Sequence, residues 1–293
     1  MLKSLYSGVT GMKNIQTKMD VISNNIANVN TTAFKTGRVR FEDMISQTNA
    51  RAQGGTNAQQ VGLGVQVGSI DTVMSGGSLQ STGRPLDFGI ENGDNSFFTV
   101  KQDNQTFYTR DGGFYTDYDG NLVTSGGLQI MGYSDIKNES DPNAGNSEDD
   151  SSDSALKPLK IYEKLTIGEG DNKKVVELQD YAIDKNGFIV GTYSDGNSYG
   201  LGRMALTNFS NPDGLEKSGG NLYIATANSG EPQLGAPSEA GFGSVRSGFL
   251  EMSNVDLANE FTEMIVTSRA YQANSRSITT SDTMLEELIN LKR

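Results

Sequence analysis

Apolar residues recur at steps of three and four residues at both ends of this chain, and most of the chain's length separates the two series. Such spacing predicts a helix with one narrow apolar stripe, which must be covered by another element to be stable. The N-terminal series comprises Leu2, Leu5, Val9, Met12, Ile15, Met19, Ile22, Ile26 and Val29. The C-terminal series comprises Leu257, Phe261, Met264, Ser268, Tyr271, Ser275, Ile278, Asp282, Leu285 and Ile289, and seven of these ten are apolar or aromatic.

Local signals indicate where these helices begin and how stable they are. Gly8 and Gly11 should each weaken the first turns by roughly 1 kcal/mol relative to alanine, so the N-terminal helix needs a partner. Ser253 or Asn254 is a plausible N-cap for the C-terminal helix. The two helices either form an antiparallel pair that closes one domain, or dock separately on the middle of the chain.

The middle of the chain, from about residue 60 to 250, has the pattern of a β domain. Short runs rich in β-branched and aromatic residues alternate with polar positions. Asp119-Gly120, Asn186-Gly187 and Asp195-Gly196 separate such runs and suit tight hairpins. The sequence therefore predicts an α+β protein with discontinuous N- and C-terminal helices, which form a coiled-coil terminal domain, and a central, mainly antiparallel β domain.

We expect four regions along the chain. Residues 1–30 form the N-terminal helix, 31–65 an extended bridging segment, 66–250 the central β domain, and 251–293 the C-terminal helix. Residues 138–156 contain six acidic residues and no lysine or arginine, so this stretch should be an exposed, disordered loop within the β domain.

The amino-acid composition limits the kinds of catalysis and metal binding that the chain can support. The chain has no histidine and no cysteine, which removes the commonest general base, the thiol nucleophile and the soft metal ligands. Asp117, Asp119 and Gly120 lack the further ligands of a calcium loop, so a hairpin turn is favoured there. We therefore expect no catalytic residues, no cofactor and no metal. A secreted enzyme or glycan-binding module with helical ends is the alternative from another class.

Charge and hydropathy bear on partners and location. The net charge is −12, which argues against nucleic-acid binding. No apolar run is long enough to span a membrane, and the first residues lack the continuous apolar core and cleavage site of a secretory signal. We expect no membrane insertion and no cleaved signal peptide.

Asn24, Asn25, Asn28 and Asn30 cluster where the N-terminal stripe is still periodic. Asparagine favours helix ends and turns, so a helix C-terminus followed by a loop accounts for part of this cluster. The density of side-chain amides also suits hydrogen bonding between neighbouring subunits of a crowded assembly.

Residues 19–30 (MDVISNNIANVN) with Phe34-Lys35, and the segment from Ser253 to Ser275, resemble the paired terminal signatures of the flagellar rod and hook proteins. Middle segments 82–87, 97–100, 108–112 and 211–215 agree as well, so the resemblance covers nearly the whole chain except about 136–180. Within the family, residues 61–65, 193–196 and 288–291 favour the hook protein of the short Gram-positive form. The distal rod protein is the next closest.

The resemblance implies a self-assembling structural subunit and not an enzyme. Its terminal helices would line a tube, and as a hook subunit it would form a flexible joint that transmits torque from the basal-body rod to the filament. Implied partners are further copies, other axial proteins such as rod, hook cap and hook–filament junction proteins, and the flagellar type III export apparatus. The implied location is the flagellum, outside the cell.

We expect the assembly interface to include the apolar stripes, the asparagine cluster and Phe34. Its residues are Leu5, Val9, Met12, Met19, Ile22, Asn24, Asn25, Ile26, Asn28, Phe34, Leu257, Phe261, Met264, Tyr271, Ile278, Leu285 and Ile289.

Overall fold

The structure is a computed structural model that describes residues 2–51, 54–55, 57–102, 105–133, 156–167 and 174–291. The acidic segment 138–156 therefore lies outside the described residues, except for Leu156. The chain divides into two compact units. Unit 1 consists of Met1–Asn30, Lys35–Val73 and Val255–Arg293, and unit 2 of Thr31–Phe34 and Met74–Asn254.

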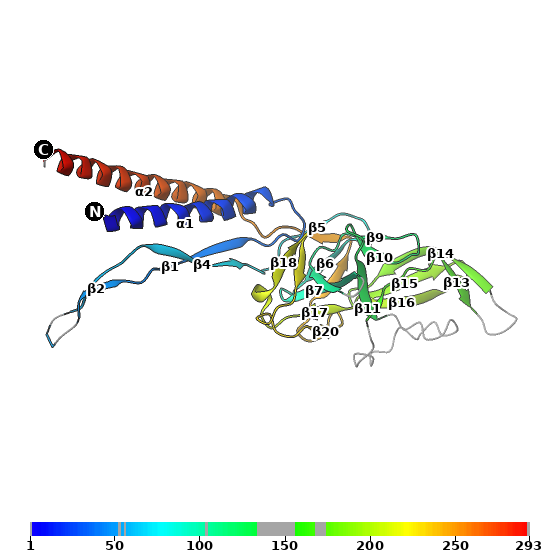
Figure 1. Ribbon diagram of the computed structural model, residues 1–293. Helices are drawn as coiled ribbons and strands as arrows, with labels where there is room; N and C mark the ends of the chain where they lie inside the picture. The colour runs from blue at the N-terminus through cyan, green and yellow to red at the C-terminus, as the bar shows by residue number, and fades with distance from the viewer. Residues whose placement is uncertain are drawn as a thin grey trace. The chain divides into compact units, whose positions relative to one another are not determined.

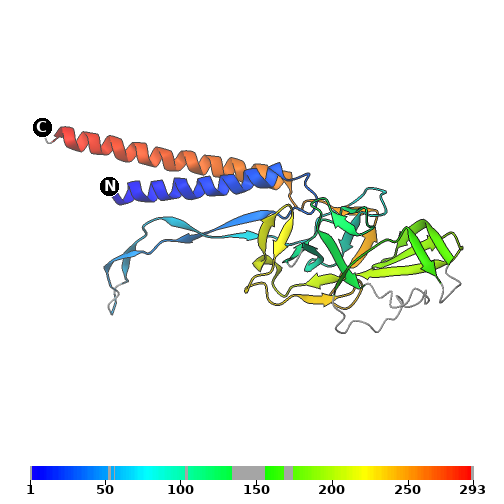
Figure 2. The same cartoon turned by 45° about the vertical axis from the view of Figure 1, so that its right-hand side comes forward.

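Unit 1 contains both long helices and a hairpin. The helices are α1 (Leu2–Ala27) and α2 (Leu257–Leu291), and the strands are β1 (Gly37–Asp43), β2 (Gln47–Ala50), β3 (Gln59–Val61) and β4 (Val65–Thr72). The helices lie side by side and run in opposite directions, as both views show (Figures 1 and 2). Of the two arrangements that the sequence leaves open, the structure shows the antiparallel pair (Figures 1 and 2).

The capping of α2 differs from our prediction. Asp256 is the cap, because its Oδ1 accepts hydrogen bonds from the amides of Ala258 at 2.9 Å and Asn259 at 3.4 Å. The side chain of Asn254 instead donates to the carbonyl of Ser75 at 3.2 Å. An aspartate two residues further along therefore takes the capping role.

The hairpin of unit 1 lies along α1. Strands β1 and β4 pair antiparallel from Gly37 opposite Thr72 to Asp43 opposite Val65, with a register shift between Arg40 and Phe41. Beyond them, β2 and β3 pair as well. Asn14 of α1 donates a hydrogen bond to the carbonyl of Val65, which fixes β4 to the helix. Residues 31–65, which we expected to be a bridging segment, thus include three strands of this hairpin.

Unit 2 is an antiparallel β domain, as the sequence predicts. Its main sheet has the strand order β13-β14-β15-β16-β11-β7-β8-β19-β18, with β9, β10, β12, β17 and β20 off this path. Two further pairs, β6 with β21 and β5 with β22, are also antiparallel. The strands from β5 to β12 are β5 (Leu79–Ser81), β6 (Phe88–Glu91), β7 (Ser96–Gln102), β8 (Gln105–Thr109), β9 (Phe114–Thr116), β10 (Leu122–Thr124), β11 (Gln129–Tyr133) and β12 (Lys157–Pro158). The later elements are β13 (Lys164–Ile167), β14 (Lys174–Ile183), β15 (Phe188–Tyr193), β16 (Ser198–Met204), β17 (Leu206–Asn208), the short 3₁₀ helix η1 (Pro212–Gly214), β18 (Glu216–Gly219), β19 (Leu222–Ile224), β20 (Gln233–Gly235), β21 (Ser244–Ser247) and β22 (Phe249–Glu251).

The predicted turns join neighbouring strands of unit 2. The turn that holds Gly187 connects β14 to β15, and its φ of +77° lies in the left-handed region that glycine adopts without strain. Gly196, with φ of +78°, does the same between β15 and β16. The Asp-Gly and Asn-Gly signals in the sequence therefore mark hairpins, as predicted.

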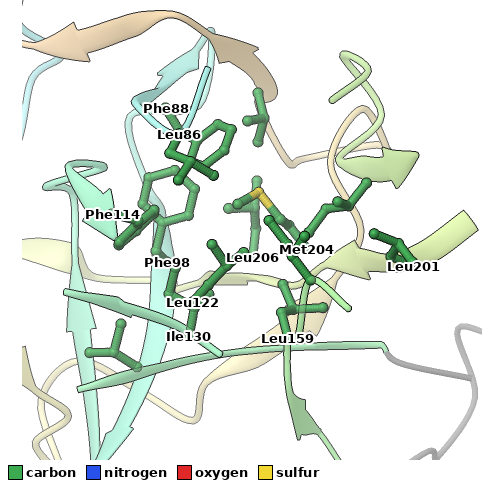
Figure 3. Close-up of a cluster of buried hydrophobic side chains, with 14 of the residues drawn as sticks. Leu86, Phe88, Phe98, Phe114, Leu122, Ile130, Leu159, Leu201, Met204 and Leu206 are labelled. Atoms are coloured by element: carbon green, nitrogen blue, oxygen red, sulfur yellow. The ribbon is translucent and has the colours of Figure 1, made fainter. Parts of the chain in front are cut away.

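One large apolar cluster forms the core of unit 2 (Figure 3). Phe98 and Phe114 meet edge to face at 5.4 Å between ring centroids, a favourable aromatic arrangement. The labelled members are Leu86, Phe88, Phe98, Phe114, Leu122, Ile130, Leu159, Leu201, Met204 and Leu206. A second cluster packs Met74, Phe97, Tyr108, Phe209, Leu215 and Tyr223 together.

Candidate assembly interface

The contact between the helices uses the glycines of α1. A Cβ atom added to Gly8 would lie 3.0 Å from Cγ1 of Ile278, and one added to Gly11 would lie 3.0 Å from Nδ2 of Asn274. Both glycines are buried, so the two backbones approach closely at these positions. The glycines that cost helix propensity thus form the face that contacts α2.

The face of α2 that contacts α1 is more polar than the predicted stripe. Thr267 is only 2% exposed, and Asn274 and Ile278 face the glycines of α1. Ser281 lies 3.5 Å from Ser4 between their hydroxyl oxygens, and Glu263 forms an ion pair with Lys18 at 2.6 Å. Small and polar side chains therefore line much of this contact.

The residues of the predicted α2 stripe consequently differ in exposure. Its exposed apolar members are Leu257, Phe261, Tyr271 and Ile289, with exposed fractions of 39% to 66%. Its half-buried apolar members are Met264, Ile278 and Leu285. Within one chain, α1 covers only one side of the stripe, and the other side faces outward from the helix pair.

The predicted residues of α1 also differ in burial. Ile22 is 4% exposed, whereas Val9 is 39% exposed. The half-buried residues are Leu5, Met12, Met19 and Ile26. These four lie at the margin between the covered and the open side of the helix.

Exposed apolar residues outside the predicted stripes add to this surface. On α2, Ile265 is 63% exposed and Val266 57%. Ile265 lies four residues beyond Phe261, so it extends the row that begins at Leu257 along one side of the helix. In the hairpin, Ile45 is 86% exposed and Ile70 52%. A search for one apolar stripe per helix misses Ile265 and Val266, because they lie beside the predicted stripe, and it does not consider the strands.

Asn25 is buried, and its hydrogen bonds stay within unit 1. Its Oδ1 accepts from the amide of Gly37 at 3.0 Å, and its Nδ2 donates to the carbonyl of Gly37 at 2.9 Å. Nδ2 also donates to Oε1 of Glu260 at 3.2 Å. Asn25 thus pairs with β1 as a neighbouring strand would and joins α1, β1 and α2.

The other asparagines of the cluster lie nearer the surface. Asn24 is exposed, and Nδ2 of Asn28 donates to the carbonyl of Asn24 at 2.9 Å and to its Oδ1 at 3.0 Å. This pair lies at the C-terminal end of α1. Hydrogen bonding between subunits stays a prediction for Asn24.

Phe34 belongs to unit 2. Lys217 of β18 places its Nζ 5.1 Å from the centroid of the Phe34 ring. Burial lowers the pKa of Lys217 from its usual value. The carbonyl of Phe34 accepts a hydrogen bond from the amide of Asn254 at 3.4 Å.

Replacing Asn25 by alanine should weaken the assembled form by about 2 kcal/mol, because the half-buried amide and carbonyl of Gly37 then lose their partner. Such a loss corresponds to a rise of roughly 30-fold in the critical concentration for polymerisation. Sedimentation of polymer from monomer at a series of protein concentrations measures this value. Asn24→Ala is the matched control and should leave it within about twofold. Equal effects of the two substitutions would contradict the role given to Asn25.

Burial raises the pKa of Glu260, and the negative charge of Glu263 raises it further, while the side chains of Asn25 and Thr36 and the charge of Lys18 lower it. Val21, Ile22, Val39 and Val73 line the same hollow of unit 1 and limit the water around the carboxyl group. A carboxyl whose pKa is raised by folding favours the folded state at low pH, and this contribution is lost as pH rises through the raised pKa.

Unit 1 should therefore lose some stability as pH rises from 4.5, the usual pKa of this side chain, towards neutrality. Glu260→Gln should remove this contribution, because glutamine does not titrate in that range. The measurement is the urea concentration that dissociates the polymer, taken across this pH range for both proteins. Parallel pH profiles for the two would contradict the prediction.

Two general findings bear on other functions. Among the described residues, no group of three or more histidine, cysteine, aspartate or glutamate side chains could hold a metal ion. Within the same residues, neither helix combines the length and the apolar character needed to cross a membrane.

Comparison with known protein families finds three matches along the chain. The family described as "Flagella basal body rod protein" matches residues 5–35, and the "Flagellar basal body rod FlgEFG protein C-terminal" family matches residues 246–291. The "Flagellar hook protein FlgE/F/G D1 domain" family matches residues 92–191. The terminal matches include nearly all of α1 and the whole of α2.

Curated relatives are similar over their full lengths. The flagellar basal-body rod protein FlgG of Bacillus subtilis is 44% identical over 300 aligned positions, covering 100% of both chains. Two proteins of Borreliella burgdorferi also cover 100% of both chains: its basal-body rod protein FlgG is 36% identical over 304 positions, and its flagellar hook protein FlgE is 33% identical over 443 positions.

Proposed function

This chain belongs to the family of flagellar rod and hook proteins, and we propose that it is a structural subunit of the flagellar rod, of the FlgG type, that assembles with further copies into a tube. The rod protein of Bacillus subtilis supports this choice, since it aligns with the 293 residues over 300 positions. The two chains therefore differ little in length. The known function of the family is structural, so no catalytic step is assigned.

The proposal that the chain assembles rests on one observation: a row of apolar side chains on α2 is exposed. Leu257, Phe261 and Ile265 are 39%, 49% and 63% exposed, and their spacing of four residues puts them on one side of the helix. A contiguous exposed apolar surface of this kind is characteristic of an interaction site. We call these three residues the outer α2 row. A neighbouring copy of the chain is the occupant that the proposal requires.

The helix pair also fits a subunit that folds fully only on assembly. The contact between α1 and α2 is lined by small and polar side chains such as Thr267 and Asn274, so it buries little apolar area. Ordering these helices costs conformational entropy, which contacts with neighbouring subunits would offset.

The flagellar hook, which the sequence resemblance alone favours, is the second candidate. The Borreliella burgdorferi hook protein covers this whole chain at 33% identity. Its alignment runs over 443 positions, however, so a large part of that protein has no counterpart in these 293 residues. The rod protein of the same organism aligns over 304 positions. This contrast favours the rod.

The remaining partners belong to the same proposal. A rod subunit would contact other axial proteins at the ends of its own tube segment, and a hook subunit would also meet the hook cap and the hook–filament junction proteins. Export through the flagellar type III apparatus, without a cleaved signal peptide, would bring the chain to its place outside the cell.

Immunogold labelling of isolated hook–basal bodies, with an antibody against unit 2, separates the two candidates. We expect label on the rod. Label on the hook alone would support the hook assignment, and particles without label from cells that produce the protein would contradict both. Hook–basal bodies from a strain that lacks the gene are the control for antibody specificity.

A further inference from the structure

The chain passes between its two units through three segments: residues 30–35, 73–74 and 254–255. On the unit 2 side, a single residue contacts all three segments or their immediate continuations. The carbonyl of Glu251 accepts a hydrogen bond from the amide of Ala33 at 2.8 Å, and its Oε1 accepts one from the amide of Gly77 at 2.8 Å. Glu251 itself ends β22, from which the chain continues into the third segment.

Glu251 is held in this place by Arg110. The Nε of Arg110 donates to Oε2 of Glu251 at 2.9 Å, and both side chains are only 1% exposed. Nη1 of Arg110 donates to the carbonyls of Gly93 and Ser96, the latter at 2.7 Å. The buried charge pair is thus hydrogen bonded on both partners, which is the condition for such a pair to be tolerated.

The surrounding backbone is packed closely against the same point. A Cβ added to Gly77 would lie 1.9 Å from the carbonyl oxygen of Met252, so the continuations of the second and third segments within unit 2 touch there. Ala33 adopts a φ of +56°, in the left-handed region that is costly for residues other than glycine, and is 1% exposed. Strain of this kind persists only where neighbouring contacts hold the backbone in place.

We propose that the Arg110–Glu251 pair is an anchor that holds the three connecting segments together on unit 2, and that assembly depends on it. Glu251 acts directly on the segments, and Arg110 is a positioning residue for Glu251. The anchor fixes the points at which the three segments leave unit 2, which subunits need if they are to pack alike in a tube. The dependence of assembly rests on the proposed function, whereas the anchor itself does not.

The alternative is that the Arg110–Glu251 pair only fills space in the interior of unit 2. The variant R110M/E251M separates the two readings, because replacing a buried ion pair by apolar side chains of similar volume is often neutral for stability. The variant keeps the interior filled but removes the acceptor for the amide of Gly77 and the donor for the carbonyls of Gly93 and Ser96. E251M alone should destabilise the whole of unit 2, since it leaves Arg110 buried without its partner.

The measurement is residue-level hydrogen exchange of the full-length protein below its polymerisation threshold. In R110M/E251M we expect the amide of Gly77 to exchange about 10- to 100-fold faster, the range for a lost hydrogen bond to a charged group. The amides of Val100 and Ile130, which pair across β7 and β11, should be unchanged. An unchanged Gly77 amide overturns the proposal, and so does a loss of protection that is equal at Gly77 and in the core. E91Q, which breaks the half-exposed Glu91–Arg246 pair, is the control and should change neither.

Polymerisation of the same proteins tests the second half of the proposal. R110M/E251M should fail to polymerise under conditions in which the wild-type chain and E91Q do. If the double variant polymerises normally while its Gly77 amide is unprotected, the anchor is not needed for assembly and the proposal falls. A wild-type chain that never polymerises would instead contradict the proposed function, and the exchange result would stand apart from it.

Discussion

Phe261→Asp should leave the protein monomeric at concentrations at which the wild-type chain forms polymers. Phe261 lies in the middle of the outer α2 row and is 49% exposed, so the substitution removes nothing from the interior of the monomer. In a polymer whose subunits cover this row, it would bury an unpaired carboxylate, which costs several kcal/mol per subunit contact. Analytical ultracentrifugation and negative-stain electron microscopy measure the outcome.

Thr262→Asp is the matched control for this prediction. Thr262 is the next residue, is exposed, and receives the same charge, but it lies about 100° around α2 from Phe261. Polymerisation should persist in this variant. If both substitutions abolish assembly, general charge on α2 and not the outer α2 row is responsible, and if neither does, the row is not an interface.

Gly112→Ala should destabilise unit 2 by about 3 kcal/mol, at the upper end of the usual cost of overpacking. A Cβ at this position would lie 1.8 Å from the carbonyl oxygen of Phe88, and Gly112 itself accepts a hydrogen bond from the amide of Phe88 at 3.0 Å. The clash is with backbone, so no change of rotamer can relieve it. Urea unfolding of the monomer, followed by tyrosine fluorescence, gives the free energy of unfolding.

The neighbouring Gly113 provides the control for this second prediction. A Cβ there would lie 3.5 Å from Oδ1 of Asp111 and 4.0 Å from Cδ2 of Leu250, which are ordinary contacts. Gly113→Ala should therefore change the stability by less than about 1 kcal/mol. Similar losses at the two glycines would mean that the close approach of Gly112 to Phe88 is not present in the protein.

The sequence predicts the elements of this fold better than their contacts. Periodicity identifies both helices, and dipeptides such as Asn186-Gly187 identify hairpins, because these signals depend on a few neighbouring residues. The sequence did not predict that residues 37–72 form a hairpin, because most of β1 is exposed and a strand without a buried face shows weak alternation.

The sequence alone could not predict which faces of the two helices contact each other. Helix propensity predicts that Gly8 and Gly11 weaken α1. It does not predict that the backbone of α2 comes within contact distance of these two glycines. The apolar period of α2 marks the side that needs cover, whereas α1 covers a neighbouring side through Thr267 and Asn274. Which neighbour covers which side is decided by the other subunits, and these are not encoded in the period of one helix.

Asn25 and Glu251 show the same limit for polar residues. Asn25 stands in a run of asparagines that looks uniform in sequence, yet the structure buries it against Gly37 and Glu260 while Asn24 stays at the surface. Glu251 has no sequence signal of its own, because its partners Ala33, Gly77 and Arg110 are far from it along the chain. Long-range partners of this kind become visible only in three dimensions.

The central claim is that copies of this chain build a tube by covering the outer α2 row of their neighbours. Cryo-electron microscopy of isolated hook–basal bodies, at a resolution that shows side chains, tests it most directly. The account predicts density for this chain in the rod, with Leu257, Phe261 and Ile265 buried against adjacent subunits. A rod in which this chain is present but these three side chains face water would contradict it.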